Sequence, residues 1–291
     1  MASVKDLRDR IRSLKNTQQI TKAMKQVAAA KIRRAETAQK QARPYADTLS
    51  EMLEDLIASV SSVDHPFMKS GAPGAPSGVI LMTADKGLAG AFNSNVIRAG
   101  EIYAREHAGT IFYTVGVKAR NAVRRLGQLD RPTWALHAPS KIDAAREIAQ
   151  CVAGDFVAGK ISDIMLVSSK MISMMSQKPQ TQRLVPIVAD ELSRLAGTAG
   201  PVGPKNSVEF SPSPELVLSR LLPKYLEFTI FSAMLETDAA FFAAQLVAMN
   251  NATDNAGKLI DELTIVMNNA RQASITKELL EIVGGAEALS G

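Results

Sequence analysis

Apolar residues near the start of the chain recur every three or four positions, which places them on one face of a helix. The first 43 residues contain no glycine, proline or aromatic residue. Their apolar stripe begins with Val4, Leu7, Ile11 and Leu14. It shifts by about one residue near Gln18 and resumes through Ile20, Met24 and Val27, which predicts a coiled coil that is locally re-wound.

This first helix is predicted to be unusually long. Pro44 is a candidate kink, but the pattern continues through Leu49, Leu53, Leu56 and Val60. A helix of about 60 residues spans roughly 90 Å, whereas helices of globular proteins average about a dozen residues. The segment is therefore too long to be an ordinary core element.

The last part of the chain has the same character. No proline occurs between Lys224 and Val283, and no aromatic residue follows Phe242. The spacing of the a and d positions in a coiled-coil heptad matches that of Leu246, Met249, Thr253, Ala256, Ile260, Leu263, Met267, Ala270 and Ser274. Because several of these side chains are small, two helices can approach closely along this seam.

Between the two helical segments the pattern changes to short apolar runs that suit buried strands. These runs are Val79–Met82, Ile111–Val115 and Ile164–Ser168, with residues 182–188 as a candidate further strand. Helices are expected near residues 94–107, 118–127 and 141–158. Strands that alternate with helices predict a mainly parallel sheet, and loops rich in proline are expected over residues 64–78 and 196–214.

The predicted fold is α/β, with a central Rossmann-like domain and a long antiparallel coiled coil of the N- and C-terminal helices. The three segments comprise residues 1–62, 77–195 and 210–287. Both helices start from the same side of the domain, so they must run antiparallel if they pair. Residues 1–43 carry 12 basic and 3 acidic side chains and the C-terminal segment is acidic, although exposed ion pairs contribute only about 0–1 kcal/mol each. The last helix is expected to project past its partner.

Few residues suit catalytic or metal chemistry. The single cysteine, Cys151, excludes an internal disulfide and a cysteine-based zinc cluster, and its apolar surroundings predict a buried, unreactive thiol. His65, His107 and His137 have no second ligand nearby in the sequence and are interpreted as surface or internally satisfied residues. The sequence contains no run of about 18 apolar residues, so no membrane span is predicted. The chain is expected to be cytoplasmic.

One loop resembles a phosphate-binding turn in its position only. Asp85, Lys86, Gly87 and Leu88 follow a predicted strand and precede a predicted helix. The segment lacks the glycine pattern of a dinucleotide fold and that of a P-loop. A turn that contacts a protein partner is therefore favoured over a nucleotide site.

Several strings resemble the gamma subunit family of bacterial F-type ATP synthases, and the resemblance covers essentially the whole chain. They are Ile11–Arg34 (IRSLKNTQQITKAMKQVAAAKIRR), Thr83–Asn93 (TADKGLAGAFN), Ala248–Ala256 (AMNNATDNA) and Ala270–Gly285 (ARQASITKELLEIVGG). The last string is the most specific because it mixes polar and apolar types over a long match. The chain departs from the family pattern at Ala240–Leu246, where a glutamate and an arginine are missing.

The resemblance implies a non-catalytic rotor shaft that couples proton flow to ATP synthesis and needs no cofactor or metal of its own. The implied partners are the alpha and beta subunits of the catalytic hexamer, the epsilon subunit and the membrane ring of c subunits. It also implies a peripheral position on the cytoplasmic side of the bacterial inner membrane.

Six residues match family positions that contact beta subunits or are linked to coupling: Met24, Lys25, Arg271, Gln272, Thr276 and Glu278. The first two would face the moving levers of the beta subunits, the next two would hold a beta-subunit loop, and the last two would affect coupling. Asp85–Leu88 would form a platform turn. Met24 and Ile275 are equally consistent with packing in the helical seam.

Two other functions are compatible with parts of the sequence. A nucleotide-binding enzyme would use the α/β domain, but it needs a phosphate loop or an acid–base pair that the sequence does not show. A nucleic-acid tether would use the basic first segment, but no aromatic side chain that could stack on bases precedes Tyr45. Neither function explains why a long helical seam flanks the domain at each end.

Overall fold

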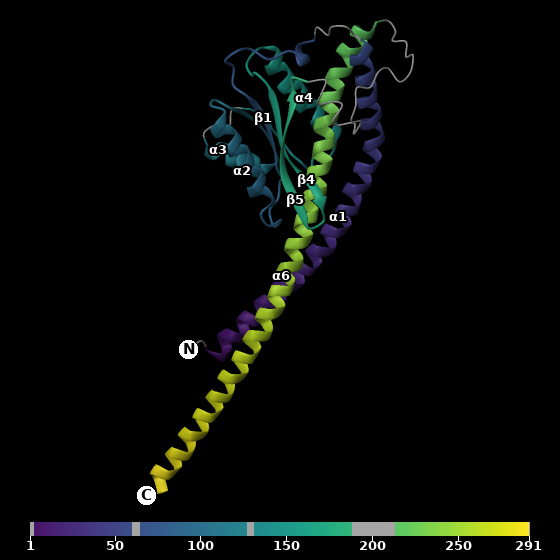
Figure 1. Ribbon diagram of the computed structural model, residues 1–291. Coiled ribbons are helices and arrows are strands. Elements are labelled where there is room, and N and C mark those ends of the chain that lie inside the picture. The colour runs from purple at the N-terminus through teal and green to yellow at the C-terminus, as the bar shows by residue number, and fades with distance from the viewer. Residues whose placement is uncertain (1–2, 60–64, 127–130, 188–212, 291) are drawn as a thin grey trace. The chain divides into compact units, whose positions relative to one another are not determined.

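The computed structural model describes residues 3–59, 65–126, 131–187 and 213–290 (Figure 1). The chain forms two compact units, one of residues 1–28 with 246–291 and one of residues 29–245. Two long helices contribute to both units: α1, Val4–Ser59, and α6, Pro214–Ser290. Pro44 lies inside α1. The two units divide the chain differently from the three predicted segments, whose boundaries stay a prediction.

A five-stranded sheet forms the centre of the larger unit, with the order β3-β2-β1-β4-β5. The strands are Gly78–Met82 (β1), Ile111–Val115 (β2), Thr133–Trp134 (β3), Ile164–Ser173 (β4) and Ser176–Val185 (β5). The first four are parallel, and β5 is antiparallel to β4. This strand order is that of a doubly wound sheet, which confirms the predicted Rossmann-like α/β fold.

Helices cover both faces of the sheet. On one face, α2 (Phe92–Glu106) and α3 (Val117–Arg125) bury Val79, Leu81 and Phe112 of the strands (Figure 1). On the other face lie α4 (Lys141–Val157) and part of α6. Because β1 is covered on both sides, all five of its residues are buried, as its continuous apolar run predicts.

The part of α6 in the larger unit is a core helix, in which every residue from Thr237 to Gln245 is buried. Within Glu215–Val283, a window with mean hydropathy 1.3 is long and apolar enough to cross a membrane, by length and composition alone. Since 61% of that window is buried inside the protein, the window is what a core helix produces and is weak evidence for a span.

In the smaller unit, α1 and α6 pair as an antiparallel coiled coil. Thr253 Oγ1 donates a hydrogen bond of 2.8 Å to Thr21 Oγ1, and Lys25 Nζ donates one of 2.6 Å to Asn250 Oδ1. The later residue of α1 thus meets the earlier residue of α6. The predicted antiparallel pairing is confirmed for this unit.

The predicted shift of the α1 seam near Gln18 is wrong. Side chains that are buried or half-buried follow an unbroken alternation of three and four residues: Val4, Leu7, Ile11, Leu14, Gln18, Thr21, Lys25 and Ala28. Ile20 and Val27, which the predicted stripe included, are 60% and 55% exposed. The apolar pattern was misleading because three seam positions are polar and find polar partners on α6.

Some boundaries within the α/β unit also differ from the prediction. β4 and β5 extend beyond the predicted strands as a hairpin, and the two-residue β3 was not predicted. Apart from the half-buried Met171, the hairpin residues that lie beyond the sheet core are polar or exposed, so they carry no regular apolar pattern. The loop expected over 196–214 lies almost wholly outside the described residues, as does Val60.

Candidate functional site

The last part of α6 is exposed at every residue from Arg271 to Val283. The register of the coiled coil explains this exposure. Thr21 meets Thr253, so equal steps along the two helices place Val4 opposite Ala270. Because α1 begins at Val4, no described part of that helix lies beside the residues that follow. The predicted projection of α6 past its partner is confirmed.

Four of the predicted contact residues lie on this exposed end of α6: Arg271, Gln272, Thr276 and Glu278. Thr276 Oγ1 donates a hydrogen bond of 3.0 Å to the carbonyl oxygen of Gln272. Glu278 Oε1 accepts one of 3.3 Å from the hydroxyl of Ser274. Both bonds run along the helix, so they leave the exposed surface of these residues available to another molecule.

The exposed end of α6 is also apolar. Five large side chains are each between 48% and 68% exposed: Ile275, Leu279, Leu280, Ile282 and Val283. Contiguous apolar surface of this kind marks a protein-binding surface in soluble proteins. The alternative that Ile275 packs in the helical seam is therefore wrong within the described chain.

Met24 and Lys25, the two predicted contact residues of α1, have different surroundings. Both are half-buried. Lys25 belongs to the seam and binds Asn250, whereas Met24 lies at the seam edge, between the exposed Ile20 and Val27 along the helix. Ile20, Met24 and Val27 thus form a second apolar stripe, which flanks the seam.

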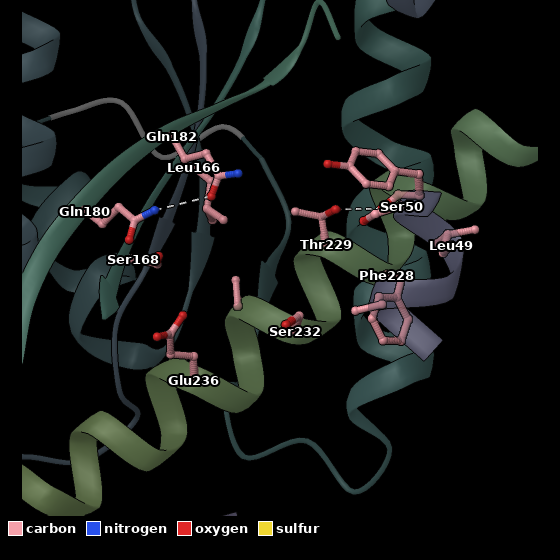
Figure 2. A pocket seen from close by; sticks show the side chains of 13 residues that line it. Leu49, Ser50, Leu166, Ser168, Gln180, Gln182, Phe228, Thr229, Ser232 and Glu236 are labelled. Carbon is pink, nitrogen blue, oxygen red and sulfur yellow. Dashed lines mark hydrogen bonds between the residues drawn. The ribbon is translucent and has the colours of Figure 1, made fainter. Parts of the chain in front are cut away.

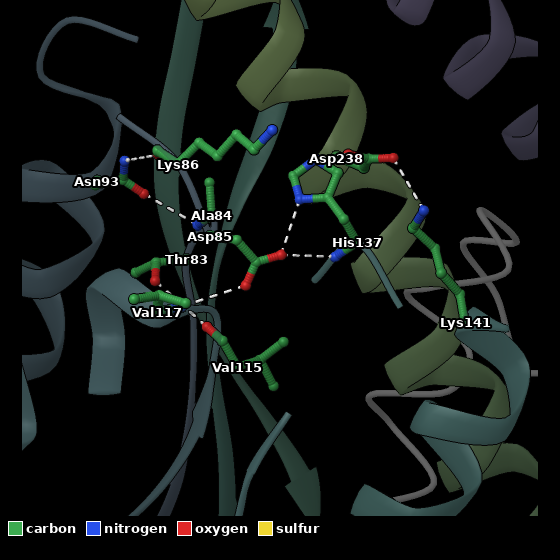
Figure 3. Close-up of polar contacts among 10 residues, drawn as sticks. All are labelled: Thr83, Ala84, Asp85, Lys86, Asn93, Val115, Val117, His137, Lys141 and Asp238. Carbon is green, nitrogen blue, oxygen red and sulfur yellow. Dashed lines mark hydrogen bonds and ion pairs between the residues drawn. The ribbon is translucent and has the colours of Figure 1, made fainter. Parts of the chain in front are cut away.

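The predicted platform turn follows β1 and is held from within by Asn93 (Figure 3). Asn93 Oδ1 accepts a hydrogen bond of 3.0 Å from the backbone N–H of Ala84, and its amide donates one of 3.1 Å to the carbonyl oxygen of Lys86. Leu88 has a φ of 61°, in the left-handed region that leucine rarely adopts, and is 62% exposed. The turn therefore presents Lys86 and Leu88 to solvent in a fixed conformation.

The Asp85 carboxylate points inward and builds a site that the sequence did not reveal (Figure 3). Its oxygens accept hydrogen bonds from the backbone N–H of Val117 at 3.3 Å and of His137 at 2.9 Å. The His137 ring lies between two acids, with Nδ1 2.9 Å from Asp85 and Nε2 3.0 Å from Asp238 of α6. Lys141 Nζ lies 3.1 Å from the other oxygen of Asp238. We call these four side chains, of Asp85, His137, Lys141 and Asp238, the histidine clasp.

Charges in the histidine clasp stabilise one another. Contacts with Asp238 and then Asp85 raise the pKa of His137 to about 9 against the opposing effect of burial. Burial acts to raise the pKa of Asp85 and of Asp238, but the contacts with His137, and for Asp238 also those with Lys141, outweigh it and both pKa values are lowered. His137 is therefore an imidazolium at neutral pH, which confirms that it is an internally satisfied residue.

The histidine clasp lies beyond the carboxyl end of β1, where doubly wound folds bind nucleotides. The two carboxylates already bind the charged groups of His137 and Lys141, so these cations are not available to a phosphate group. Over the described ranges, no group of three or more histidine, cysteine or acidic side chains is arranged to hold a metal ion. Cys151 is half-buried, and burial raises the pKa of its thiol, which keeps it protonated and unreactive.

The departure from the family pattern is an aromatic cluster next to the clasp. Phe241 is 1% exposed, and its ring lies 5.7 Å from the ring of Phe92 and 5.7 Å from that of His137. Lys31 Nζ lies 4.9 Å from the centre of the Phe242 ring. Aromatic packing thus surrounds Phe241, the position at which the sequence resemblance implies a glutamate.

A cavity of about 180 Å³ lies between α1, α6 and the hairpin β4–β5 in the larger unit (Figure 2). Apolar and amide side chains line it, among them Leu166, Gln180 and Gln182, together with the carboxyl group of Glu236. Burial raises the pKa of Glu236, and the charge of Lys170 opposes this effect. The mixed lining does not single out a ligand.

Known proteins resemble this chain over nearly its whole length. A family model described as ATP synthase matches residues 3–289. The ATP synthase gamma chain of Heliobacterium modesticaldum is 41% identical over 292 residues, which cover 99% of this chain and 100% of that one. The ATP synthase gamma chain of Pelotomaculum thermopropionicum is 43% identical over 293 residues, with the same two coverages.

Solved structures share the fold. A chain of the Euglena gracilis mitochondrial ATP synthase has a TM-score of 0.68 and 19% identity, and the match covers 98% of this chain and 94% of that one. A chain of the central stalk and c-ring structure from Tetrahymena thermophila has a TM-score of 0.59 and 21% identity, with coverages of 80% and 99%. The family model and the relatives above show that the chain belongs to the ATP synthase gamma chain family.

Proposed function

We propose that this protein is the central rotor shaft of an F-type ATP synthase and couples proton flow through the c-ring to ATP synthesis at the beta subunits. The carrying observation is the coiled coil of the smaller unit, in which α6 continues beyond α1 as an exposed segment, Arg271–Val283. Membership of the gamma chain family supports the proposal. The shaft would itself be non-catalytic, since the nucleotide position of its α/β unit is filled by the histidine clasp.

A shaft can drive catalysis only if each rotational angle favours a different set of beta-subunit conformations. The coiled-coil unit has the unequal surface that this requires. α1 presents the apolar stripe of Ile20, Met24 and Val27, while α6 exposes Leu259 and Val266. A partner that meets these surfaces in turn makes different contacts at each angle, and nucleotide binding biases the angle reciprocally.

The proposed contact residues form two groups, one on the exposed end of α6 and one on α1. Arg271 and Gln272 would hold a loop of a beta subunit, because an exposed guanidinium can donate several directed hydrogen bonds to carboxylates. Thr276 and Glu278 would tune this contact from the same helix end. Met24 would meet the moving lever directly, whereas Lys25 would act mainly through its bond to Asn250.

The α/β unit would contact the epsilon subunit and the c-ring, on the cytoplasmic side of the bacterial inner membrane. Lys86 and Leu88 are exposed on the platform turn, so they are the residues of that turn that a partner would reach. Asp85 would not contact the partner, because its carboxylate is bound inside the histidine clasp.

A rotation assay tests this function. The Cys151→Ser, Met175→Cys variant provides one attachment site, since Met175 is 78% exposed on the hairpin β4–β5. We expect a probe on this cysteine to rotate in one direction when ATP is added to the surface-held complex with alpha and beta subunits. ATP hydrolysis by an assembled complex whose probe stays still would overturn the proposal.

A further inference from the structure

The seam of the coiled coil contains a polar layer, which we define as Gln18, Thr21, Lys25, Asn250 and Thr253. The seam around this layer is apolar. Its buried residues include Leu7, Ile11 and Ala28 of α1, and Met249 and Ile260 of α6. Polar residues in an apolar seam reduce its stability but can specify a single register. The layer therefore needs an explanation other than stability.

The members of the polar layer satisfy one another in two short chains. Thr21 Oγ1 accepts a hydrogen bond from Thr253 and donates one of 3.0 Å to the carbonyl oxygen of Gln18. Lys25 Nζ donates to Asn250 Oδ1, and the Asn250 amide donates to Asp254 at 3.0 Å. The bonds that cross between the helices, from Lys25 to Asn250, from Thr253 to Thr21 and from Gln18 to the Thr253 carbonyl oxygen, form at only one relative position of the helices. The hydroxyl groups of Thr21 and Thr253 also reach carbonyl oxygens of their own helices.

The shape of the seam is matched to the same position. Gln18 Nε2 lies 3.5 Å from the carbonyl oxygen of Thr253 and opposite Gly257. A Cβ atom at Gly257 would lie 3.1 Å from Gln18 Nε2, closer than most such contacts. The long side chain of Gln18 is therefore accommodated by the one glycine in this part of α6.

A heptad seam without polar residues would permit other registers. Sliding α6 by seven residues, about 10 Å, again places a and d positions against a and d positions. With the polar layer present, the same slide separates Lys25 from Asn250 and Thr21 from Thr253. The half-buried ammonium group of Lys25 then loses its hydrogen bond to Asn250, which is costly, so the slid register is disfavoured.

We infer that the polar layer is a register lock that sets how far α6 extends past α1. The register determines where Arg271 and the residues after it stand relative to α1. If the chain is the shaft proposed above, the five residues of the layer are positioning residues that fix the height at which α6 meets the beta subunits. The lock itself does not depend on that function.

Disulfide trapping in the full-length chain tests the lock. In a Cys151→Ser background, Ile11→Cys with Leu263→Cys reports the native register, because equal steps from Thr21 and Thr253 bring these positions together. Ile11→Cys with Ala256→Cys or with Ala270→Cys reports a slide of one heptad. With the layer intact, we expect only the native pair to form a disulfide.

The layer is then made apolar by the changes Gln18→Leu, Thr21→Val, Lys25→Leu, Asn250→Leu and Thr253→Val. In this variant we expect the slid pairs to cross-link as well, with yields raised at least about tenfold, as removal of a penalty of about 1.4 kcal/mol or more would give. Restoring Lys25 and Asn250 should suppress the slid pairs again. A matched control exchanges Leu7→Ile and Ile260→Leu, and it should keep the native pair alone.

The inference is overturned if the apolar variant still forms only the native pair, or if slid pairs form while the layer is intact. Loss of every cross-link in the apolar variant also overturns it, because the layer would then hold the helices together and not select their register. A chain that fails the rotation assay yet shows a single register would remove the proposed function and leave the lock standing.

Discussion

His137 and Asp85 lie on different loops 52 residues apart, yet Nδ1 of the histidine is 2.9 Å from Oδ2 of the aspartate. Since His137 also reaches Asp238, one imidazole joins the turn after β1 to helix α6 within the larger unit. If the chain is a rotor shaft, torque that enters the platform turn reaches the long helix through this joint.

Stability should depend on pH through His137. Its pKa is about 9 in the folded chain and about 6.5 in the unfolded chain, so its contribution is complete below pH 6.5 and is lost as pH rises through 9. As the pH rises from about 6.5 to 9, we expect the unfolding free energy of the native chain to fall by up to about 3 kcal/mol. The His137→Gln variant should not show this fall. Asp85 and Asp238 stay ionised throughout, because their pKa values are lowered.

The measurement is urea unfolding at several pH values, followed through the single tryptophan, Trp134, which lies in the same unit. An Asp85→Asn variant should lower the pKa of His137 and move the loss to lower pH. Parallel stability curves for the native chain and His137→Gln would contradict the role of the histidine clasp.

Replacing Arg271 and Gln272 with alanine should impair coupling without unfolding the chain. Both residues are exposed, so we expect a change in unfolding free energy within about 0.5 kcal/mol. Loss of charge-assisted hydrogen bonds to a beta subunit should lower the ATP turnover of the reconstituted complex about tenfold or more. Lys277→Ala, on the same exposed end, serves as the control, and equal turnover in both variants would remove this pair from the mechanism.

Met24→Lys should reduce coupling more than assembly. The new ammonium group would lie beside Lys25 at the edge of the seam and in the apolar stripe that a beta subunit meets. We expect proton pumping per ATP hydrolysed to fall roughly twofold or more, while the amount of assembled complex stays close to normal. Gln26→Lys adds the same charge at an exposed position, and a pumping ratio equal to that of this control would refute the assignment.

Phe241→Glu, which introduces the acid that the sequence resemblance implies at this position, should destabilise the larger unit by about 3–5 kcal/mol. The carboxylate would be buried among aromatic rings and one helical turn from Asp238. Adding Gln245→Arg offers an ion pair at a spacing of four residues and should recover part of the loss. Thermal unfolding checks both variants against Phe241→Leu, and a glutamate variant as stable as this control would show that the position tolerates either chemistry.

Most of the fold follows from local patterns in the sequence. The apolar runs at Val79–Met82 and Ile111–Val115 are strands because both faces of the sheet are covered, and the repeat from Leu246 to Ala270 is the seam of α6. The α1 seam was placed wrongly after Leu14, because hydrophobicity ranks Ile20 above Thr21. Thr21 lies in the seam because it pairs with Thr253 of α6, and the pattern of α1 alone does not reveal this partner.

The sites were less predictable because their members are far apart in the sequence. Met24 and the residues from Arg271 onward were proposed from motif resemblance, and the structure adds that those from Arg271 to Val283 are exposed. His137 carried no signal, since its partners lie 52 and about 100 residues away and no spacing rule joins a loop histidine to an acid on a distant helix.

The uninterrupted seven-residue repeat from Val4 to Ala28 has a mechanical meaning. Such a repeat winds two helices around each other with a left-handed twist. Twisting the pair in one sense tightens this winding, and twisting it in the opposite sense opens it. If the chain is the proposed rotor shaft, the directions of rotation for synthesis and for hydrolysis therefore load this winding in opposite senses.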